Sequence, residues 1–427
     1  MTDSLTHLNA AQLEALQSDL AAALAAVADR HMTLDLSRGK PSADQLSLSD
    51  GLEDTIRGDY LAADGTDTRN YGGLRGLPEA RALGSELLGM PVDRIIAGGN
   101  SSLFFMHLCV TTALQQGLWS DARCWQRTGQ PKLLAPVPGY DRHFALSETL
   151  GLELVNIPML DDGPDLQRAR QLAAADPSIK GIWCVPKYSN PTGCVYADAT
   201  VQALAKLPAE AAADDFVVLW DNAYAVHDLS ANAPTLASIG AAADAMGTAD
   251  HIVQFASTSK MTFAGGGVAF LAASEPVLTT IERVMGCMMI GPDKVNQLRH
   301  ARFLRGRVRA HMQAHAEILA PKFKLVEDTL QAELGGLDIA RWTRPAGGYF
   351  VSLDLLPGLA RTVVDMAKAV GLTLTPAGAT FPAGHDPEDR NVRIAPTFAS
   401  LEELAAAMQT LTLCVKLASV RQLLART

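Results

Sequence analysis

Residues 252–260 read Ile-Val-Gln-Phe-Ala-Ser-Thr-Ser-Lys, and three consecutive glycines follow at positions 265–267. The first five residues are mostly apolar, which is typical of a strand buried on both faces of a sheet. In an open α/β sheet, ligands bind beyond the carboxyl ends of the strands. Lys260, at such an end, can be a solvated loop cation. Alternatively its amine can be desolvated, so that its pKa falls and it can attack an aldehyde as a Schiff-base lysine.

Short apolar runs of the same kind recur along the first two thirds of the chain. Helical patterns lie between them, for example at residues 78–90 and 103–114. Strands buried on both faces with helices between them predict a mostly parallel, doubly wound sheet, and therefore the α/β fold class. We expect its strands at residues 94–97, 132–135, 154–157, 181–185, 216–220, 252–256 and 268–272.

The composition changes near residue 300, which we take as the main domain boundary. Residues 295–334 form a long helical pattern that Pro321 is expected to kink or break. The pattern that follows (strand, turn, strand, helix, strand, helix) predicts a compact α+β unit. We therefore divide the chain into an N-terminal helix and arm (1–55), a large domain (56–295), and an interdomain helix with a small domain (296–427). The arm, which includes a helix at 8–30, is expected to pack on the small domain.

The composition also excludes several classes of protein. The 427 residues carry 36 Lys and Arg against 46 Asp and Glu, and this net charge of −10 argues against a nucleic-acid binder. The six cysteines are scattered without metal-ligand spacing, so neither a metal site nor a disulfide framework is expected. We expect no signal peptide and no transmembrane helix, and hence a soluble cytoplasmic protein.

Three more predicted strands end in residues of chemical use. The strand at 216–220 runs into Asp221-Asn222-Ala223-Tyr224, and a buried carboxylate needs a partner such as a protonated ring nitrogen, unless it caps the next helix. The strand at 181–185 is followed by Asn190-Pro191-Thr192-Gly193, a good turn in its own right. Residues 98–102 (Gly-Gly-Asn-Ser-Ser) lead from a strand into a helix, where N–H groups and hydroxyls can cradle a phosphate.

One ligand would satisfy all four strand ends. Pyridoxal phosphate needs a lysine for its aldehyde, a carboxylate for its ring nitrogen, donors for its phenolic oxygen and a cradle for its phosphate. The ordered set of such residues resembles the aminotransferase class I/II family of fold-type I pyridoxal-phosphate enzymes, from Gly39 to about Phe398. The residues that carry the resemblance are Gly99-Asn100-Ser101, Tyr140, Asn190-Pro191-Thr192-Gly193, Asp221, Tyr224, Ser257, Lys260 and Arg393.

Two segments place the resemblance more narrowly. Ser37-Arg38-Gly39-Lys40-Pro41 and Ser257-Thr258-Ser259-Lys260-Met261-Thr262 look like the divergent aspartate-aminotransferase-like branch of the family. That branch is related to the aminotransferase-like half of MocR-type regulators. We expect no winged-helix DNA-binding domain before residue 30, so the resemblance favours an enzyme over a regulator.

The resemblance implies roles in binding the cofactor. Lys260 would hold it and move the proton at the substrate Cα, and Asp221 would keep its ring nitrogen protonated. Asn190 and Tyr224 would hydrogen-bond to the phenolic oxygen, and Tyr140 would stack on the ring. Lys260, Asp221 and Tyr224 are the expected catalytic residues. Those expected to bind the phosphate are Gly99, Asn100, Ser101 and Ser257.

The resemblance also implies a substrate site and a shared dimer. Arg393 would grip the substrate α-carboxylate through its planar fork, next to Asn190. Gly39 would close over the substrate, since it has no side chain to obstruct its approach. Tyr71 resembles the tyrosine that reaches the phosphate bound by the neighbouring subunit, which implies a homodimer with shared active sites.

One position departs from the family pattern. The family usually places an arginine eight residues after the lysine, where it neutralises the cofactor phosphate, and this chain has Val268 there. The phosphate would therefore rely on hydroxyls, backbone amides, Tyr71 of the partner subunit, or a cation from elsewhere.

The expected activity is transfer of an amino group from an amino acid, aspartate or glutamate by resemblance, to a 2-oxo acid such as 2-oxoglutarate. A dicarboxylate needs a second cation, and the candidates in loops are Arg38, Lys40, Arg75, Arg142 and Lys187. Another fold-type I reaction, such as β-elimination or decarboxylation, remains an alternative. A non-catalytic ligand sensor that retains the pocket is the third.

Overall fold

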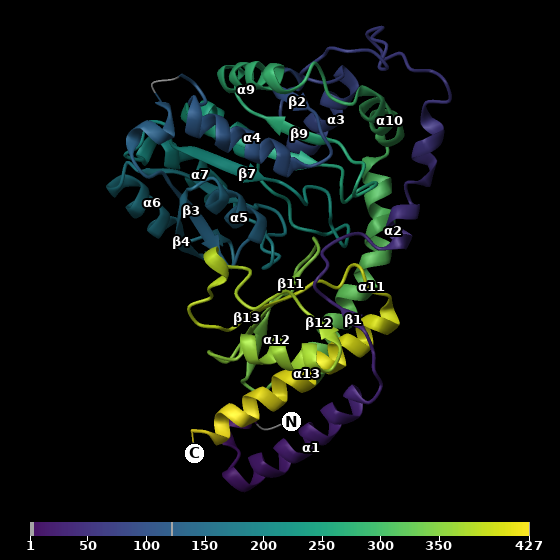
Figure 1. Cartoon of the computed structure of the whole chain (residues 1–427), viewed down its shortest axis with the longest axis vertical. Coiled ribbons are helices and arrows are strands. Elements are labelled where there is room, and N and C mark those ends of the chain that lie inside the picture. The colour runs from purple at the N-terminus through teal and green to yellow at the C-terminus, as the bar shows by residue number, and fades with distance from the viewer. Residues whose placement is uncertain (1–3, 121–122, 427) are drawn as a thin grey trace.

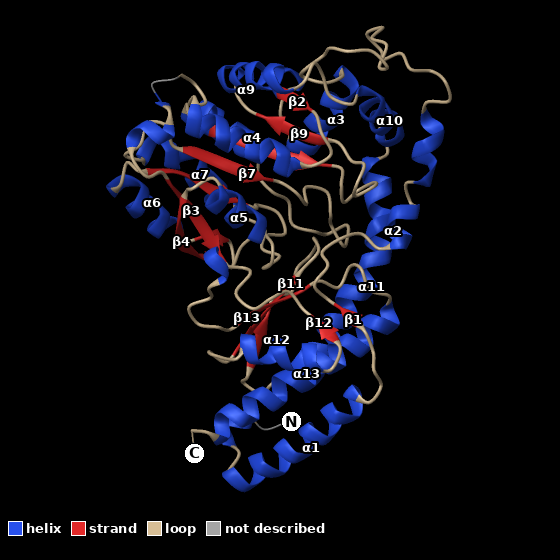
Figure 2. Ribbon diagram, in the orientation of Figure 1, coloured by secondary structure: helices blue, strands red, loops and turns tan. Residues whose placement is uncertain are grey.

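An eight-stranded sheet forms the centre of the larger part of the molecule, as the computed structural model shows (Figures 1 and 2). The structure describes residues 4–120 and 123–426, so the first three residues of the predicted 1–55 arm lie outside it. The strands, in sheet order, are β2 (Ile95–Ala97), β9 (Ala269–Ala272), β8 (Ile252–Ser257), β7 (Val217–Asp221), β6 (Ile179–Cys184), β3 (Lys132–Val137), β4 (Glu153–Leu160) and β5 (Gly163–Pro164). All seven predicted strands are present, and the short β5 is additional.

The sheet is mostly parallel, as predicted. Only β9 and β5 run antiparallel to their neighbours. The carboxyl ends of β2, β3, β6, β7 and β8 therefore meet at one edge, which faces the smaller unit (Figure 1). The helices of this part are α3 (Pro78–Leu88), α4 (Ser102–Gln115), α5 (Asp141–Thr149), α6 (Leu166–Ala175), α7 (Asp198–Glu210), α8 (Ile239–Met246) and α9 (Glu275–Met288).

Alternation along β7 decides which face carries its last residue. Val217 and Leu219 join the core under α4, whereas Val218 and Trp220 join the core under α7 on the other face. Because side chains alternate along a strand, Asp221 belongs to the α4 face, where α5 also packs.

The smaller unit combines the C-terminal third of the chain with the N-terminal arm. Its antiparallel sheet has the order β10 (Ala340–Trp342), β11 (Val351–Leu355) and β13 (Asn391–Ile394). A second sheet pairs β1 (Leu34–Asp35) with β12 (Leu372–Thr373) in parallel, and so joins the arm to this unit. The helices are α1 (Ala10–Ala28), α2 (Ala43–Ser47), α12 (Ala360–Ala369) and α13 (Leu401–Leu424). Short 3-10 turns lie at Leu5–His7, Asp50–Thr55, Val92–Arg94, Trp125–Thr128, Ala249–His251 and Pro382–Gly384.

The long helix between the units differs from the prediction. The chain breaks at Gly306, with φ of 66°, between α10 (Lys294–Leu304) and α11 (Val308–Leu334). Pro321 lies inside α11 and does not end it. Proline removes only one N–H donor from the helix, and buried side chains on both sides of it, Leu319 and Phe323, hold α11 against the core.

The hydrophobic cores support two units. Leu13 and Leu20 of the arm share a core with Leu411 and Val415 of α13. Leu298 of α10 instead joins the core beneath α3. We propose the division near residues 55 and 295, with α10 and the first turns of α11 packed on the large sheet.

Helix α13 is long and apolar enough to cross a membrane by length and composition. In the structure, however, 67% of its most apolar stretch is buried inside the protein. Burial of this kind is typical of a core helix, and α13 lies between α1 and the small sheet (Figure 1).

Buried histidines predict how stability changes with pH. Burial lowers the pKa of His227 to about 3 and that of His315 to about 4, and it also lowers the pKa values of His300 and His311. Each histidine binds its proton more readily in the unfolded chain, where its pKa is about 6.5, so protons favour unfolding. The contribution of these histidines to the melting temperature should be constant above about pH 7 and fall steadily as the pH drops from about 6.5 to 4. A melting temperature that stays flat down to about pH 5 would show that these histidines are not held neutral.

Candidate active site

A buried carboxylate, Asp221, marks the centre of the site at the end of β7. It is 1% exposed, and its Oδ2 lies 3.0 Å from Nε2 of His143 on α5. The His143 ring stacks on Trp183 of β6, with ring centroids 4.2 Å apart and planes 12° apart. Oδ1 of Asp221 is buried and has no hydrogen-bond partner among the described residues. The strand end therefore offers one carboxylate oxygen to a donor that this chain does not supply.

Lys260 lies in the turn after β8. Removal from solvent lowers the pKa of its amine, while the charge of the nearby Asp221 raises it. Its Nζ lies over the ring of Tyr224, 5.0 Å from the centroid. Tyr224 itself is buried, which raises the pKa of its hydroxyl. A lysine in such surroundings is more often neutral than a surface lysine, and so is a better nucleophile and base.

Arg393 comes to the same place from the small unit, on β13. It is 8% exposed, and its Nε donates to Oγ1 of Thr375 over 3.2 Å. Its Nη1 donates to Asp141 Oδ1 (3.1 Å) and to Asn190 Oδ1 (3.3 Å). Within the described part of the chain, Nη2 donates to no residue. One arm of the fork is therefore fixed and the other is available for an anion.

Gly39 lies beside this arginine. A Cβ at position 39 would stand 2.1 Å from Cζ of Phe350, so only glycine fits. Phe350 also contacts Arg393, whose guanidinium carbon is 4.8 Å from the ring centroid. Gly39 and Arg393, the predicted carboxylate-binding residue, therefore both contact the ring of Phe350.

The residues predicted to bind the phosphate lie in two loops that a hydrogen bond joins. Gly99, with φ of 64°, leads into Ser101, which caps α4. Asn100 Nδ2 donates to the carbonyl of Gly265 over 3.1 Å, which joins this loop to the one that follows Lys260. Ser257 Oγ, at the end of β8, lies 2.8 Å from Ser259 Oγ in the turn just before Lys260.

Val268 provides no cation to the predicted phosphate site. Its side chain is 1% exposed and belongs to the core under α3. Its backbone N–H donates to Thr258 Oγ1, and its carbonyl accepts from the N–H of Thr258. Position 268 is therefore structural in this chain.

Tyr140 precedes α5 and packs edge-on against His143, with ring centroids 4.9 Å apart. Burial and the nearby Asp221 raise the pKa of its hydroxyl. A small hollow beside it has its wall formed by Tyr140, His143, Trp183, Ser189 and Asn190. The geometry thus brings Tyr140, Asn190, Asp221, Tyr224, Lys260 and Arg393 to one region, as the sequence predicts.

Comparisons with known proteins agree with this geometry. The family model described as aspartate amino-transferase matches residues 8–427. The chain belongs to the aspartate aminotransferase family. The aspartate aminotransferase of Corynebacterium glutamicum is 42% identical over 419 residues, which cover 97% of this chain and 96% of that protein. A relative from Mycolicibacterium smegmatis is 50% identical over 401 residues, which cover 92% of this chain and 93% of that one.

Solved structures show the same fold. The crystal structure of an aspartate transaminase from C. glutamicum superposes with a TM-score of 0.95 at 41% identity, covering 99% of this chain and 100% of that one. The α-aminoadipate aminotransferase of Thermus thermophilus, solved with N-(5'-phosphopyridoxyl)-L-leucine, has a TM-score of 0.74 at 19% identity, covering 92% of this chain and 94% of that one. The fold-type I architecture, the family and the aminotransferase activity predicted from the sequence are confirmed.

No sequence pattern in this aminotransferase marks His143, Trp183 or Asp141 as residues of the site. His143 contacts Asp221 across 78 positions of sequence, so no local pattern reveals the pair. The available signal is its place three residues after Tyr140, which puts both side chains on one side of the first turn of α5.

Tyr71 does not reach the site of its own chain. It is 80% exposed in a loop, next to Gly72 and Gly73, which both have positive φ. Lys294 Nζ donates to the carbonyl of Gly72 over 2.7 Å and so holds this loop. The exposed ring is available to another chain.

The candidate cations for a second carboxylate differ in how far other contacts already hold them. Arg75 and Lys187 are committed to ion pairs, Arg75 with two glutamates of α9 and Lys187 with an aspartate at 2.6 Å. Lys40 and Arg38 both lie over the ring of Phe398, at 4.3 and 5.7 Å from its centroid, and Arg38 also pairs with Asp35. Arg142 is exposed on the first turn of α5.

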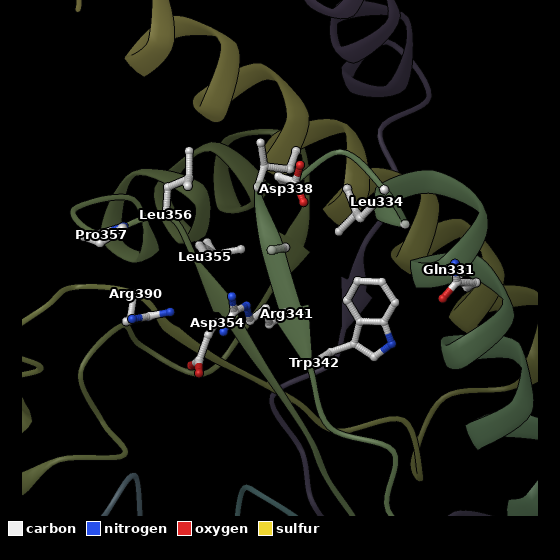
Figure 3. A pocket seen from close by; sticks show the side chains of 14 residues that line it. Gln331, Leu334, Asp338, Arg341, Trp342, Asp354, Leu355, Leu356, Pro357 and Arg390 are labelled. Carbon is white, nitrogen blue, oxygen red and sulfur yellow. The ribbon is translucent and has the colours of Figure 1, made fainter. Parts of the chain in front are cut away.

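Another hollow, larger than the one beside Tyr140, lies away from this chemistry. It lies between the end of α11 and strands β10 and β11 (Figure 3). Its volume is about 520 Å³. Two arginines and two aspartates, Arg341, Arg390, Asp338 and Asp354, contribute to its wall, so its charges balance. None of the predicted site residues lines it.

Proposed function

We propose that this aminotransferase carries pyridoxal phosphate on Lys260 and transfers an amino group between aspartate or glutamate and a 2-oxo acid such as 2-oxoglutarate. The observation that carries the cofactor proposal is the buried, unpartnered Oδ1 of Asp221 on the same site as Lys260. The amino donor is proposed from the C. glutamicum relative, which is named an aspartate aminotransferase.

The donor set fits the cofactor. A protonated pyridine nitrogen is a cationic donor of the kind that Asp221 Oδ1 lacks, and a buried carboxylate is stable when such a partner is present. When bound, pyridoxal phosphate supplies an electron sink for negative charge at the substrate Cα. Asp221, held by His143, would keep the ring nitrogen of the cofactor protonated. Tyr140 would cover the ring, and Asn190 and Tyr224 would donate to its phenolic oxygen.

Lys260 is the proposed base and acid. Its lowered pKa increases the fraction of the lysine that is neutral. The neutral amine would take the proton from the substrate Cα and return it on the cofactor side. Arg393 would hold the α-carboxylate through its free Nη2 group. Gly39, which belongs to the N-terminal arm, would close over the substrate.

The phosphate is proposed to bind at Gly99, Asn100, Ser101 and Ser257, with Tyr71 of the partner subunit taking part. This would make the protein a homodimer with shared sites, and the 80% exposure of Tyr71 supports the proposal. We further propose a cytoplasmic enzyme of the branch related to the MocR-type aminotransferase half, acting without nucleic acid or membrane.

The test is a two-substrate assay with the purified holoenzyme. Aspartate and 2-oxoglutarate should give oxaloacetate and glutamate, with ping-pong kinetics. A panel of the other amino acids measured against 2-oxoglutarate is the control for donor preference. Turnover that is faster with an apolar donor than with aspartate or glutamate would contradict the proposed substrate class.

His143 should contribute to cofactor affinity through its hydrogen bond to Asp221. The change His143→Asn removes the ring that holds Asp221 Oδ2, so we expect pyridoxal phosphate to be retained about 10–100-fold less tightly, because a hydrogen bond to a charged group contributes about 1.5–3 kcal/mol. Equilibrium dialysis of the cofactor measures this. His107→Asn, a change at an exposed histidine of α4, is the control. Equal cofactor affinity in both variants would show that His143 only fills space.

A further inference from the structure

Two carbonyl groups in the lysine turn receive hydrogen bonds from side chains that are distant in the sequence. The turn is closed by the N–H groups of Met261 and Thr262, which donate to the carbonyl of Thr258 at 2.8 and 2.9 Å. The helical turn does not continue, so the carbonyls of Lys260 and Met261 need other donors. The hydroxyl of Tyr349 donates to the carbonyl of Lys260 over 3.2 Å.

The carbonyl of Met261 has its two shortest hydrogen bonds with α11, and a longer one of 3.5 Å with the Ser49 hydroxyl. Nε2 of His311 and Nε2 of His315 lie 2.6 and 2.9 Å from the carbonyl oxygen. The two histidines are four residues apart and therefore share one face of the helix. Both are neutral at pH 7, because burial lowers the pKa of each.

Gln45 of α2 connects these donors. Its Nε2 lies 3.1 Å from the Tyr349 hydroxyl and 3.1 Å from Nδ1 of His315. One amide hydrogen goes to each, and Gln45 Oε1 accepts from the N–H of Ser42 over 3.1 Å. His315 donates through Nε2 and accepts at Nδ1, so every polar group of Gln45, Tyr349 and His315 is accounted for. All three side chains are at most 1% exposed.

The network also leads to the substrate site. Tyr349 is followed by Phe350, whose ring is close to both Gly39 and Arg393. Gln45 belongs to the same arm as Gly39, and α2 lies beside α11 (Figure 1). The position of the Lys260 backbone is thereby tied to the arm and to the strand that carries Arg393.

We propose that Gln45, Tyr349, His311 and His315 form a positioning network that fixes the backbone of the lysine turn relative to the carboxylate-binding arginine. The proposal rests on the proposed function for its effect on turnover, but the order of the turn itself can be measured without catalysis. Fixing the backbone holds the Lys260 amine at the distance from which it can move a proton, and misplacement of a catalytic group by small distances is costly.

The experiment compares Tyr349→Phe with Thr248→Val. Both changes delete a buried hydroxyl that donates to a backbone carbonyl, and Thr248 lies at the end of α8, bonded to Ala205 over 2.6 Å. Hydrogen exchange of the peptide spanning residues 258–268 is measured by mass spectrometry in cofactor-free and cofactor-loaded protein. Steady-state kinetics with aspartate and 2-oxoglutarate give kcat and KM separately.

Tyr349→Phe should speed exchange in the lysine turn by about tenfold and lower kcat by about tenfold, with KM changed less than about threefold. Thr248→Val should leave both readouts as in the wild type. If Tyr349→Phe does not fold, His315→Leu replaces it, and His315→Gln, which keeps a donor near the Nε2 position, should recover most of the loss. Unchanged exchange in the lysine turn, or a loss of kcat that His315→Gln does not correct, would overturn the proposal.

The outcomes separate the two proposals. An inactive wild type would contradict the proposed function, while the exchange rates would still decide whether the network orders the turn. An active wild type with unchanged exchange in Tyr349→Phe would contradict the network alone.

Discussion

The variant Lys260→Ala should lose amino transfer by about 10⁴-fold or more, because it removes both the attachment point of the cofactor and the proposed base. The methyl side chain can neither form an imine nor move the proton at the substrate Cα. The protein should still fold, since the contacts that hold this turn are made by the backbone carbonyl of Lys260 and by Met261 rather than by the amine.

The measurement joins kinetics to absorbance. Wild type supplied with pyridoxal phosphate should show a band at about 400–430 nm, typical of the cofactor bound to an amine, and Lys260→Ala should not. Lys260→Arg is the matched control, since it keeps a cation but offers no amine for the imine. A band of wild-type intensity in either variant would place the attachment at another lysine.

The second large effect concerns Arg393. The variant Arg393→Ala should lower kcat/KM for aspartate by about 2–4 kcal/mol, which is about 30–1,000-fold, because it removes charged hydrogen bonds to the α-carboxylate. Most of the change should be in KM, since Lys260 and Asp221 remain in place. Arg393→Lys should recover only part of the loss, since an ammonium group lacks the planar fork.

Arg390 provides the control for that experiment. It lies just before β13, pairs with Glu388 at 2.7 Å and faces the hollow of Figure 3 rather than the active site. Arg390→Ala should leave KM for aspartate unchanged. If Arg393→Ala binds amino acids as tightly as the wild type, the carboxylate role of Arg393 is wrong.

The sequence predicted those parts of the site that follow from sheet topology. Asp221 and Lys260 each end an apolar run, and the carboxyl ends of parallel strands share one edge. That rule brings the two residues together without any knowledge of tertiary contacts. The sheet and its two layers of helices were also predictable, because short apolar runs alternate with helical patterns along the sequence.

The contacts between distant segments could not be predicted in this way. His143 meets Asp221, and Gln45 meets His315, through packing between helices, and nothing in either local sequence marks the partner. The break in the long helix was misplaced for a related reason. Proline is a strong local signal at position 321, but tertiary packing overrides it, while Gly306 with positive φ makes the real turn.

The central claim is that the amine at position 260 bonds to the cofactor, and reduction with borohydride followed by peptide mapping tests it most directly. Purified protein is supplied with pyridoxal phosphate, reduced, digested and analysed by mass spectrometry. The account predicts a single phosphopyridoxyl group on the peptide that contains Lys260, in stoichiometric amount. Label on another lysine, or no label on a folded protein, would contradict it.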